Sequence, residues 1–555
     1  MRSPGSTSPG PRWGISRPAD TRVRLLWTIA FLVASLIWLV PDLDRPGVNW
    51  DEPEYFASAR RIQTWVAEFV ADPGSALQPG AIRAAWDPPE HHYFNPHPPV
   101  YKEGMALTEA VFGPVLGPVA GFRLSSAFLF AILIAAVVWT VSGTAGIVAG
   151  IGSGLSLLLM PRVFGHAHFA ATDMPLTCFW ALATLAFASF LRRGGEWRLA
   201  LAAVALGLAM GTKFTGWLLF VPLLVWAVLE RRWWPWFGLV PRALLVWYAV
   251  VPTAWHNPLD VIAHLIFESL RRDQTAPMTT FYFGTIYPYV VPWHQSIVMT
   301  LITVPVGIMS LVLIGAIDSF RSRNIRRPND SRVALARLCL LQVGFFLSLM
   351  ALPGSPNHDG VRLFLPLFPF IAVLGGLGFA RLIGFVRARV DEHRTVLGGL
   401  LLGVVFFLPA WWQTTHVSPY YLSYYNELIG GLPGAARAGM DVSYWYDAMT
   451  PEFLARVEQE VPEGAIVGTW PTWKYFEELQ AMGRLSSDIR IGRELPTQYL
   501  LLLARKSTLW PPFLDVYENV QPVLAVELDG VELAGLYVWS MDPEMISPEP
   551  EGDED

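Results

Sequence analysis

The chain has 555 residues, of which 53% are hydrophobic and 15% charged, and its mean hydropathy is +0.38. Together with 24 tryptophans, these values exceed what a soluble domain usually carries and predict an integral membrane protein. The formal net charge of −6 identifies no partner, because arginines cluster in short connectors while acids gather in the first loop and the C-terminal tail. Both cysteines, Cys178 and Cys339, lie inside apolar runs, which excludes a disulfide framework in the polar regions.

The chain begins with a basic segment, residues 1–24, followed by an apolar run at 25–40. No small-residue cleavage site follows this run, so we interpret it as an uncleaved signal anchor. A first loop at 42–121 comes next, and its cluster of acids and aromatics at 49–56 includes Asp51 and Glu52.

Further apolar runs are long enough to cross, or nearly cross, the roughly 30 Å of membrane hydrocarbon. They lie at about 122–141, 144–160, 174–191, 198–211, 215–229, 236–254, 295–316, 333–352, 363–383 and 396–412. With the first run they predict eleven spans in a catalytic membrane domain at 25–415. The two runs flanking Gly211 are short, and a single tilted helix there would change the count by one.

Arginine-rich connectors predict the orientation, because Lys and Arg are retained on the cytoplasmic side of short loops. With a cytoplasmic N-terminus, the connectors at 192–193, 231–232, 321–332 and 387–394 all fall in the cytoplasm. The first loop, the loop at 353–362 and the whole C-terminus then lie on the extracytoplasmic face.

The C-terminal part alternates short apolar runs (465–469 and 499–503), a helix-like stretch (473–482) and strand-like pieces (523–528 and 533–539). We therefore expect a mainly α polytopic membrane protein with a small extracytoplasmic α/β domain at 416–541. An acidic tail at 542–555 is expected to be disordered. The chain has no nucleotide-binding fingerprint, which argues against an ATP-driven pump, and we expect no nucleic-acid partner.

Five motifs on the predicted outer face carry the functional signal. Asp51 and Glu52 open the first loop, although acids there are often only solvated. Asp173 begins an apolar helix, where an acid is either a cap favoured by the helix dipole or an ionisable functional group at membrane depth. The other three motifs, at 95–103, 211–216 and 357–366, contribute the polar side chains His97, Tyr101, Lys102, Lys213, His358, Asp359 and Arg362.

Taken together, the motifs place carboxylates at two separated positions and the cations Lys102, Lys213 and Arg362 on one face. This combination is suited to holding a lipid phosphate while a carboxylate handles an acceptor hydroxyl. A lysine beside a span can also merely extend its charge to the interface, so no single motif is decisive.

The ordered set of motifs resembles the GT-C membrane glycosyltransferases, in particular the protein O-mannosyltransferase and aminoarabinose transferase group, glycosyltransferase family 39 and its relatives. The resemblance covers residues 20–415, and the segment at 420–447 is similar to one that follows the last span in some bacterial members. It implies sugar transfer from a polyprenyl-phosphate donor, without a nucleotide sugar, to a protein, lipid or glycan acceptor outside the cytoplasm. A bacterial inner membrane and inversion at the anomeric carbon are expected.

The resemblance also implies residue roles. Asp51 matches the first-loop acid that serves as general base or positions the acceptor, with Glu52 as its support, and Asp173 matches a second acid near the reaction centre. Lys213, Arg362 and Lys102 are candidates for the donor phosphate, where Arg offers a bidentate fork and Lys a point charge. Candidate substrate-binding residues are His97, Tyr101, His168, His358 and Asp359. Aminoarabinose transferases have Lys where this chain has His97, which speaks against that particular activity.

Two alternatives stay open. A transporter or lipid-linked sugar flippase would place ionisable residues near the bilayer midplane and often shows inverted repeats, whereas here the acids lie at span mouths and no repeat is visible. A Zn or Mn site could be built from His166, His168, Asp173 and Asp51. Two histidines at i and i+2 do not share a helical face, however, and we expect no cofactor.

Overall fold

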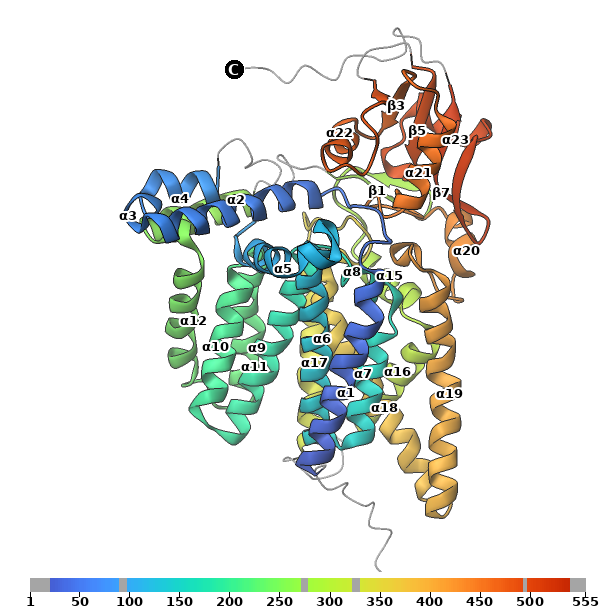
Figure 1. The fold of residues 1–555 in the computed structure, drawn as a ribbon. Helices are drawn as coiled ribbons and strands as arrows, with labels where there is room; N and C mark the ends of the chain where they lie inside the picture. The colour runs from blue at the N-terminus through green and yellow to red at the C-terminus, as the bar shows by residue number, and fades with distance from the viewer. Residues whose placement is uncertain (1–19, 89–96, 271–277, 322–329, 493–496, 540–555) are drawn as a thin grey trace, which may run out of the picture.

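The computed structural model describes residues 20–88, 97–270, 278–321, 330–492 and 497–539. It consists of a helical bundle, a layer of helices lying across one end of that bundle, and a sheet-containing region beyond this layer (Figure 1). The predicted tail at 542–555 and most of the N-terminal segment lie outside the described residues.

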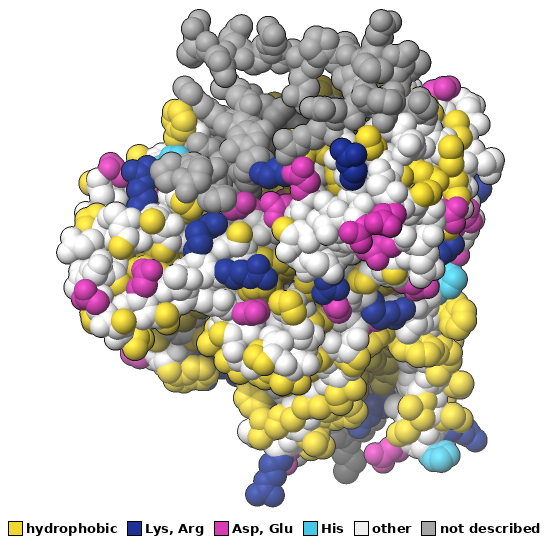
Figure 2. All heavy atoms as spheres, turned by 45° about the horizontal axis from the view of Figure 1, so that its top comes forward, with side chains coloured by type: hydrophobic (Ala, Val, Ile, Leu, Met, Phe, Trp, Pro, Cys, Tyr) yellow, Lys and Arg dark blue, Asp and Glu magenta, His cyan; other side chains and the backbone are white. Residues whose placement is uncertain are grey.

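Six helices of the described chain are long and apolar enough to cross a membrane. They are α1 (Thr21–Leu39, extended to Asp42 by η1, Val40–Asp42), α6 (Pro118–Ala145), α9 (Asp173–Arg193), α17 (Ser331–Met350), η6 with α18 (Arg362–Leu367 and Phe368–Arg387) and α19 (Glu392–His416). Hydrophobic side chains predominate on the part of the molecule that these helices form, whereas charged side chains are frequent on the other part and at the tip of the helical end (Figure 2). The protein is therefore a multi-pass membrane protein.

The predicted count of eleven spans is not confirmed by helix length and composition. The run at 295–316 forms two helices, α15 (Gln295–Thr303) and α16 (Val306–Arg321), which meet at an angle of 117°. Pro305 lies at this break, where its ring and missing N–H disfavour a continuous helix.

Other predicted runs form helices shorter than the six long ones. They are α7 (Ile147–Leu158), α10 (Glu196–Met210), η3 with α11 (Phe214–Leu219 and Phe220–Leu229) and α12 (Trp236–Val250). A further short helix, α13 (Pro258–Leu270), follows α12 in the chain. Gly146, with φ +96°, separates α6 from α7. The odd span count and the orientation remain predictions.

The bundle is held together by close helix contacts at glycines. An added Cβ at Gly378 of α18 would lie 1.9 Å from the Leu311 carbonyl oxygen of α16, and one at Gly315 of α16 would lie 2.1 Å from the Leu374 carbonyl oxygen. Small residues allow helix backbones to approach this closely in a membrane, where van der Waals packing drives association.

The layer across the end of the bundle comes from the first loop: α2 (Glu52–Ala71), α3 (Pro73–Ala76), α4 (Pro79–Trp86) and α5 (Val100–Leu116) (Figure 1). Aromatic rings pack α2 against α4, with Trp65 and Trp86 edge to face at 5.4 Å. Short elements connect the remaining chain: α8 (Pro161–His166), η4 (Pro252–Ala254), the hairpin β1–β2 (Thr280–Tyr282 and Thr285–Tyr287), η7 (Tyr421–Ser423) and α20 (Gly431–Arg437).

The region after α20 contains a five-stranded mixed sheet of order β4-β3-β5-β7-β6. Its strands are β3 (Ile466–Trp470), β4 (Arg490–Ile491), β5 (Tyr499–Leu503), β6 (Leu524–Leu528) and β7 (Val531–Val538). β3 is parallel to its two neighbours, the edge strand β4 and the central strand β5, whereas β7 is antiparallel to β5 and β6. Helices α21 (Pro451–Glu460), α22 (Lys474–Ala481) and α23 (Pro511–Asn519) and the turn η8 (Lys506–Thr508) accompany it.

Candidate active site

Asp51 lies at the start of α2, where a reciprocal hydrogen-bond pair fixes the backbone. The Asn49 side-chain oxygen accepts the N–H groups of Asp51 (2.8 Å) and Glu52 (3.0 Å), and the Glu52 carboxylate accepts the N–H of Asn49 (2.8 Å). This exchange has the form of a capping box, which satisfies the otherwise unpaired donors at a helix start. The Asp51 side chain itself makes no capping hydrogen bond to the start of the helix.

Glu52 does not share the site of Asp51. It is fully buried, and Arg123 binds both of its oxygens with Nε (2.8 Å) and Nη2 (2.7 Å) while the Ala170 N–H donates to one of them (2.8 Å). The remaining Arg123 donors bind backbone carbonyls of residues 43–47. The Glu52 carboxylate thus fastens the first loop to α6 through Arg123.

Arg362 is the centre of the site. Its guanidinium contacts three carboxylates, Asp51 through Nη2, Asp173 through Nε (3.0 Å) and Asp359 through Nη1 (3.0 Å). We call these four residues the Arg362 cluster. The indole of Trp445 lies 4.3 Å from the guanidinium carbon, a cation–π distance. One side chain therefore joins the first loop, the start of α9 and the 353–362 loop.

Lys213 adds a second cation to the cluster. Its Nζ lies 2.7 Å from Asp173 Oδ1, and both side chains are buried. The turn that presents Lys213 requires a glycine at 211, because a Cβ there would lie 2.6 Å from the Val100 side chain, and the Gly211 carbonyl accepts the Val100 N–H (2.9 Å). The turn after α10 is thereby fastened to the start of α5.

Asp359 connects the cluster to the sheet region. It adopts φ +57° and is followed by Gly360 at φ +65°, so the chain turns sharply just before Arg362. Arg505, which follows β5, places Nη2 3.0 Å from Asp359 Oδ1. Burial alone would raise the pKa of Asp359, but Arg505, His358 and Arg362 together bring that pKa below its ordinary value.

Asp51 has the opposite balance. Burial raises the pKa of Asp51, and the nearby carboxylates of Asp359 and Asp173 raise it further, whereas Arg362 and Lys213 offset only part of the effect. Asp51 is therefore held by Arg362 yet binds a proton more readily than an ordinary carboxylate. A shifted pKa of this kind is typical of groups that exchange protons during a reaction.

A cavity of about 400 Å³ opens beside the cluster. Of the predicted residues, Asp51, His358, Asp359 and Arg362 line it, and Asp173 with Lys213 lies directly behind Arg362. Its other walls are Trp50, Pro53, Glu54, Met278, Tyr444, Trp445, Tyr446, Pro471, Lys474, Tyr475, Glu478, Arg505 and Thr508. The cavity thus lies between the first loop, the start of η6 and the C-terminal region.

Four other predicted residues do not line this cavity. Lys102 donates to the His97 carbonyl (2.9 Å), and His97 lies against Phe214 and lines a separate cavity of about 360 Å³. Tyr101 packs edge to face on Tyr55, and His168 stacks on Tyr421. Within the described residues, no group of three or more His, Cys, Asp and Glu side chains could hold a metal ion. The alternative metal set of His166, His168, Asp173 and Asp51 is therefore not assembled.

The structure adds functional candidates that the motifs did not indicate, chiefly Trp445 over Arg362 and Arg505 beside Asp359. The aromatic run at 444–446, directly before Asp447, is a signal that could have identified Trp445. Arg505 carries no local signal, because only the sheet brings the end of β5 to the cluster.

Comparison with known proteins gave a family match and several structural similarities. Residues 96–256 match the family model described as dolichyl-phosphate-mannose-protein mannosyltransferase. A search of curated proteins gave no significant match.

Among solved structures, ArnT from Cupriavidus metallidurans bound to undecaprenyl phosphate is similar at 14% identity and a TM-score of 0.45, over 94% of this chain and 99% of that one. The Archaeoglobus fulgidus oligosaccharyltransferase is similar at 12% identity and a TM-score of 0.45, over 85% of this chain and 65% of that one. The arabinofuranosyltransferase AftD from Mycobacteria is similar at 14% identity and a TM-score of 0.39, over 95% of this chain and 40% of that one. The family match over residues 96–256 confirms the expected resemblance: this chain is similar to the protein mannosyltransferases among the GT-C membrane glycosyltransferases.

Proposed function

We propose that the protein is a membrane glycosyltransferase that moves a sugar from a polyprenyl-phosphate donor to an acceptor, and that the cavity at the Arg362 cluster is its active site. The observation that carries the proposal is the contact between Asp51 and Arg362 at the wall of this cavity. It sets a carboxylate with a raised pKa beside a cation suited to a phosphate, as transfer from a lipid phosphate requires.

The donor phosphate has a defined place in this scheme. A guanidinium carries five N–H groups, and the three carboxylates take one at each nitrogen, so one N–H on Nη1 and one on Nη2 of Arg362 remain for phosphate oxygens. Lys213 adds positive charge to the cluster and pairs with Asp173. As the bond between the anomeric carbon and the phosphate oxygen breaks, Arg362 stabilises the charge that develops on the leaving polyprenyl phosphate.

The acceptor enters from the other side of the sugar. Its hydroxyl oxygen forms a bond to the anomeric carbon on the face opposite the phosphate, which inverts the configuration. Asp51 orients the hydroxyl and accepts its proton. Because the phosphate is already a good leaving group, we expect positioning and charge stabilisation to supply most of the rate enhancement.

We assign the acceptor side of the cavity to the C-terminal region, at 416–541, which supplies Tyr444, Lys474, Glu478 and Arg505 to the wall. The arginine-rich connectors predict a cytoplasmic N-terminus and an odd number of spans. In this topology the C-terminal region and the Arg362 cluster face the extracytoplasmic side of a bacterial inner membrane. The sequence leaves the sugar and the acceptor open.

Transfer by Asp51→Asn protein in reconstituted vesicles tests the proposal. The variant keeps the side-chain shape but can neither accept the proton nor pair with Arg362 as an anion, so transfer should be abolished. The assay follows polyprenyl phosphate released from a polyprenyl-phosphate sugar. Glu68→Gln is the matched control, because Glu68 is an exposed acid on the same helix, and it should retain full activity. Normal turnover by folded Asp51→Asn protein would refute the role of Asp51.

A further inference from the structure

A third cavity, of about 250 Å³, lies at the opposite end of the bundle from the Arg362 cluster. Helix α9 connects the two ends: it begins at Asp173, in the cluster, and ends at Arg193, in this cavity. Its 21 residues rise about 30 Å at 1.5 Å per residue, which matches the thickness of the membrane hydrocarbon. The cavity therefore lies where the helices reach the second membrane surface.

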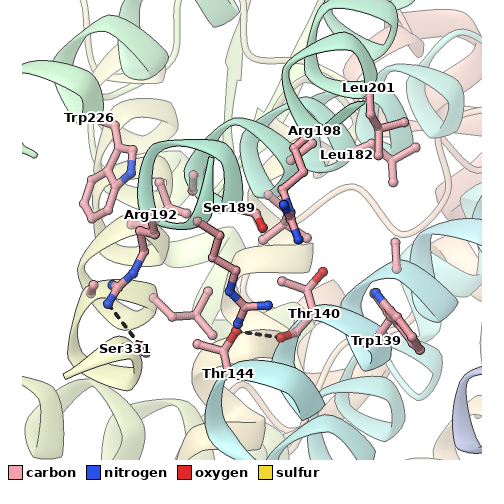
Figure 3. Close-up of a pocket in the computed structure, with 18 of the residues that line it drawn as sticks. Trp139, Thr140, Thr144, Leu182, Ser189, Arg192, Arg198, Leu201, Trp226 and Ser331 are labelled. Carbon is pink, nitrogen blue, oxygen red and sulfur yellow. Dashed lines mark hydrogen bonds between the residues drawn. The ribbon is translucent and has the colours of Figure 1, made fainter. Parts of the chain in front are cut away.

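Four arginines from three helices meet there: Arg24 of α1, Arg192 and Arg193 of α9, and Arg198 of α10. We call their cavity the arginine pocket. In Figure 3, Arg192 and Arg198 extend from one side of the pocket, and Trp139, Thr140 and Thr144 of α6 lie on the other. Retention of Lys and Arg on the cytoplasmic side explains why arginines are frequent at this end of the bundle. It does not explain why four of them line one cavity.

The polar partners of these arginines are neutral. Arg192 donates to the Ser331 hydroxyl (3.0 Å), Arg193 to the Gly143 carbonyl (3.3 Å) and Arg198 to the Gly194 carbonyl (2.8 Å). Arg24 donates to the Trp139 carbonyl (2.6 Å), and its guanidinium lies 3.5 Å from the Trp139 ring.

No carboxylate balances this charge in the part of the chain that the structure describes. No Asp or Glu lines the pocket, and none of the four arginines forms an ion pair with a described carboxylate. Arg24 instead experiences the positive charge of Arg193. Because no described carboxylate pairs with these four arginines, their charge is available for an anion.

Most of the remaining lining is apolar. It includes Leu182, Leu185, Leu201, Trp226, Leu335 and Leu338. Trp197 and Leu201 at the start of α10 are 62% and 42% exposed, so the pocket has an apolar rim on its outer side. A ligand that fits has an anionic head for the arginines and a hydrocarbon tail for this rim.

We propose that the arginine pocket binds the phosphate headgroup of an anionic membrane phospholipid. Clusters of arginine beside membrane-spanning helices attract such headgroups, and guanidinium groups match phosphate oxygens in a bidentate manner. The site is separate from the donor phosphate site at the Arg362 cluster, and the inference does not depend on the proposed transferase activity.

Lipid binding to the purified protein in neutral detergent, followed by native mass spectrometry, tests this inference. The probes are phosphatidylglycerol and phosphatidylcholine with the same acyl chains. We expect wild-type protein to retain phosphatidylglycerol in preference to phosphatidylcholine. The Arg193→Gln/Arg198→Gln variant should bind phosphatidylglycerol about 25-fold more weakly, at about fivefold for each arginine.

The substitutions remove hydrogen bonds to backbone carbonyls and, at Arg198, a cation–π contact with Trp197. The single variant Arg193→Gln, with an expected fivefold loss, serves if the double variant does not fold. The matched control is Arg387→Gln/Arg389→Gln, which removes two exposed arginines around the end of α18, outside the pocket, and should bind as the wild type does. Equal retention of the two lipids, or an equal loss in the control, would overturn the inference. Displacement of phosphatidylglycerol by an equal concentration of inorganic phosphate would also overturn it, because the ligand would then be a soluble anion.

Discussion

The charges at Arg362 balance one another across the site: three carboxylates, Asp51, Asp173 and Asp359, face three cations, Arg362, Lys213 and Arg505. Buried charges are tolerated when they are paired and hydrogen-bonded, and removal of one partner leaves the others uncompensated. The fork of Arg362 serves three acids at once. A bound phosphate would add negative charge at the point where this guanidinium still has free donors.

Arg362→Lys tests the importance of the fork. Lysine keeps the charge but offers a single ammonium group, so it cannot hold three carboxylates and a phosphate in fixed directions. We expect kcat/KM for transfer to fall about 100- to 1000-fold, as when one preorganised donor is removed from an oxyanion site. Arg389→Lys, on an exposed arginine, should leave kcat/KM unchanged. A rate for Arg362→Lys within twofold of the wild type would show that the fork is not needed.

The raised pKa of Asp51 predicts how transfer depends on pH. Asp51 must be ionised to accept a proton, and burial places its pKa above that of an ordinary carboxyl group. Activity should therefore fall as the pH is lowered through this pKa and should be fully present above it. Measured kcat/KM against pH should show this acidic limb. A rate that rises towards low pH would mean that Asp51 acts in its protonated form.

At the scale of elements, the packing of α16 on α18 depends on glycine. A Cβ at Gly378 would lie 1.9 Å from the Leu311 carbonyl oxygen, whereas one at Gly384 of the same helix would meet nothing within 4 Å. Gly378→Ala should lower the melting temperature of the purified protein because the helices must separate. Gly384→Ala should leave it unchanged or raise it slightly, since alanine favours a helix by about 1 kcal/mol. Equal melting temperatures for the two variants would show that the close approach adds nothing to stability.

Hydrophobic runs predicted the long helices well and the broken ones poorly. The run at 174–191 corresponds to α9, and the run at 333–352 corresponds to α17. The run at 295–316 is equally apolar, but Pro305 bends it, and hydropathy does not record backbone geometry. The runs near Gly211 form helices of fewer residues, because the chain turns there to present Lys213.

At the scale of the whole molecule, the central residues of the site were predictable because they lie at the ends of spans on one predicted face. Asp51, Asp173, Lys213 and Arg362 do converge. His97, Lys102 and His168 occur in similar sequence contexts but lie in other parts of the protein, and no local pattern separates them. Tyr101 packs on Tyr55 and does not line the cavity. Trp445 and Arg505 arrive through tertiary contacts from a distant region, which sequence spacing cannot reveal.

The predicted orientation can be checked with a membrane-impermeant thiol reagent on intact spheroplasts. The natural cysteines Cys178 and Cys339 are buried and should not react. Asp529→Cys, at the exposed tip of the β6–β7 hairpin, should be labelled from outside, whereas Arg193→Cys should react only after the membrane is opened. The reverse pattern would invert the topology and move the Arg362 cluster to the cytoplasmic side.

A structure of the protein with a bound polyprenyl-phosphate sugar would test the central claim most directly. The account predicts phosphate oxygens within hydrogen-bond distance of Arg362, with the anomeric carbon between the phosphate and Asp51 and the polyprenyl chain leading into the bilayer. A phosphate bound elsewhere, for example in the cavity lined by His97, with the Arg362 cluster unchanged, would contradict it.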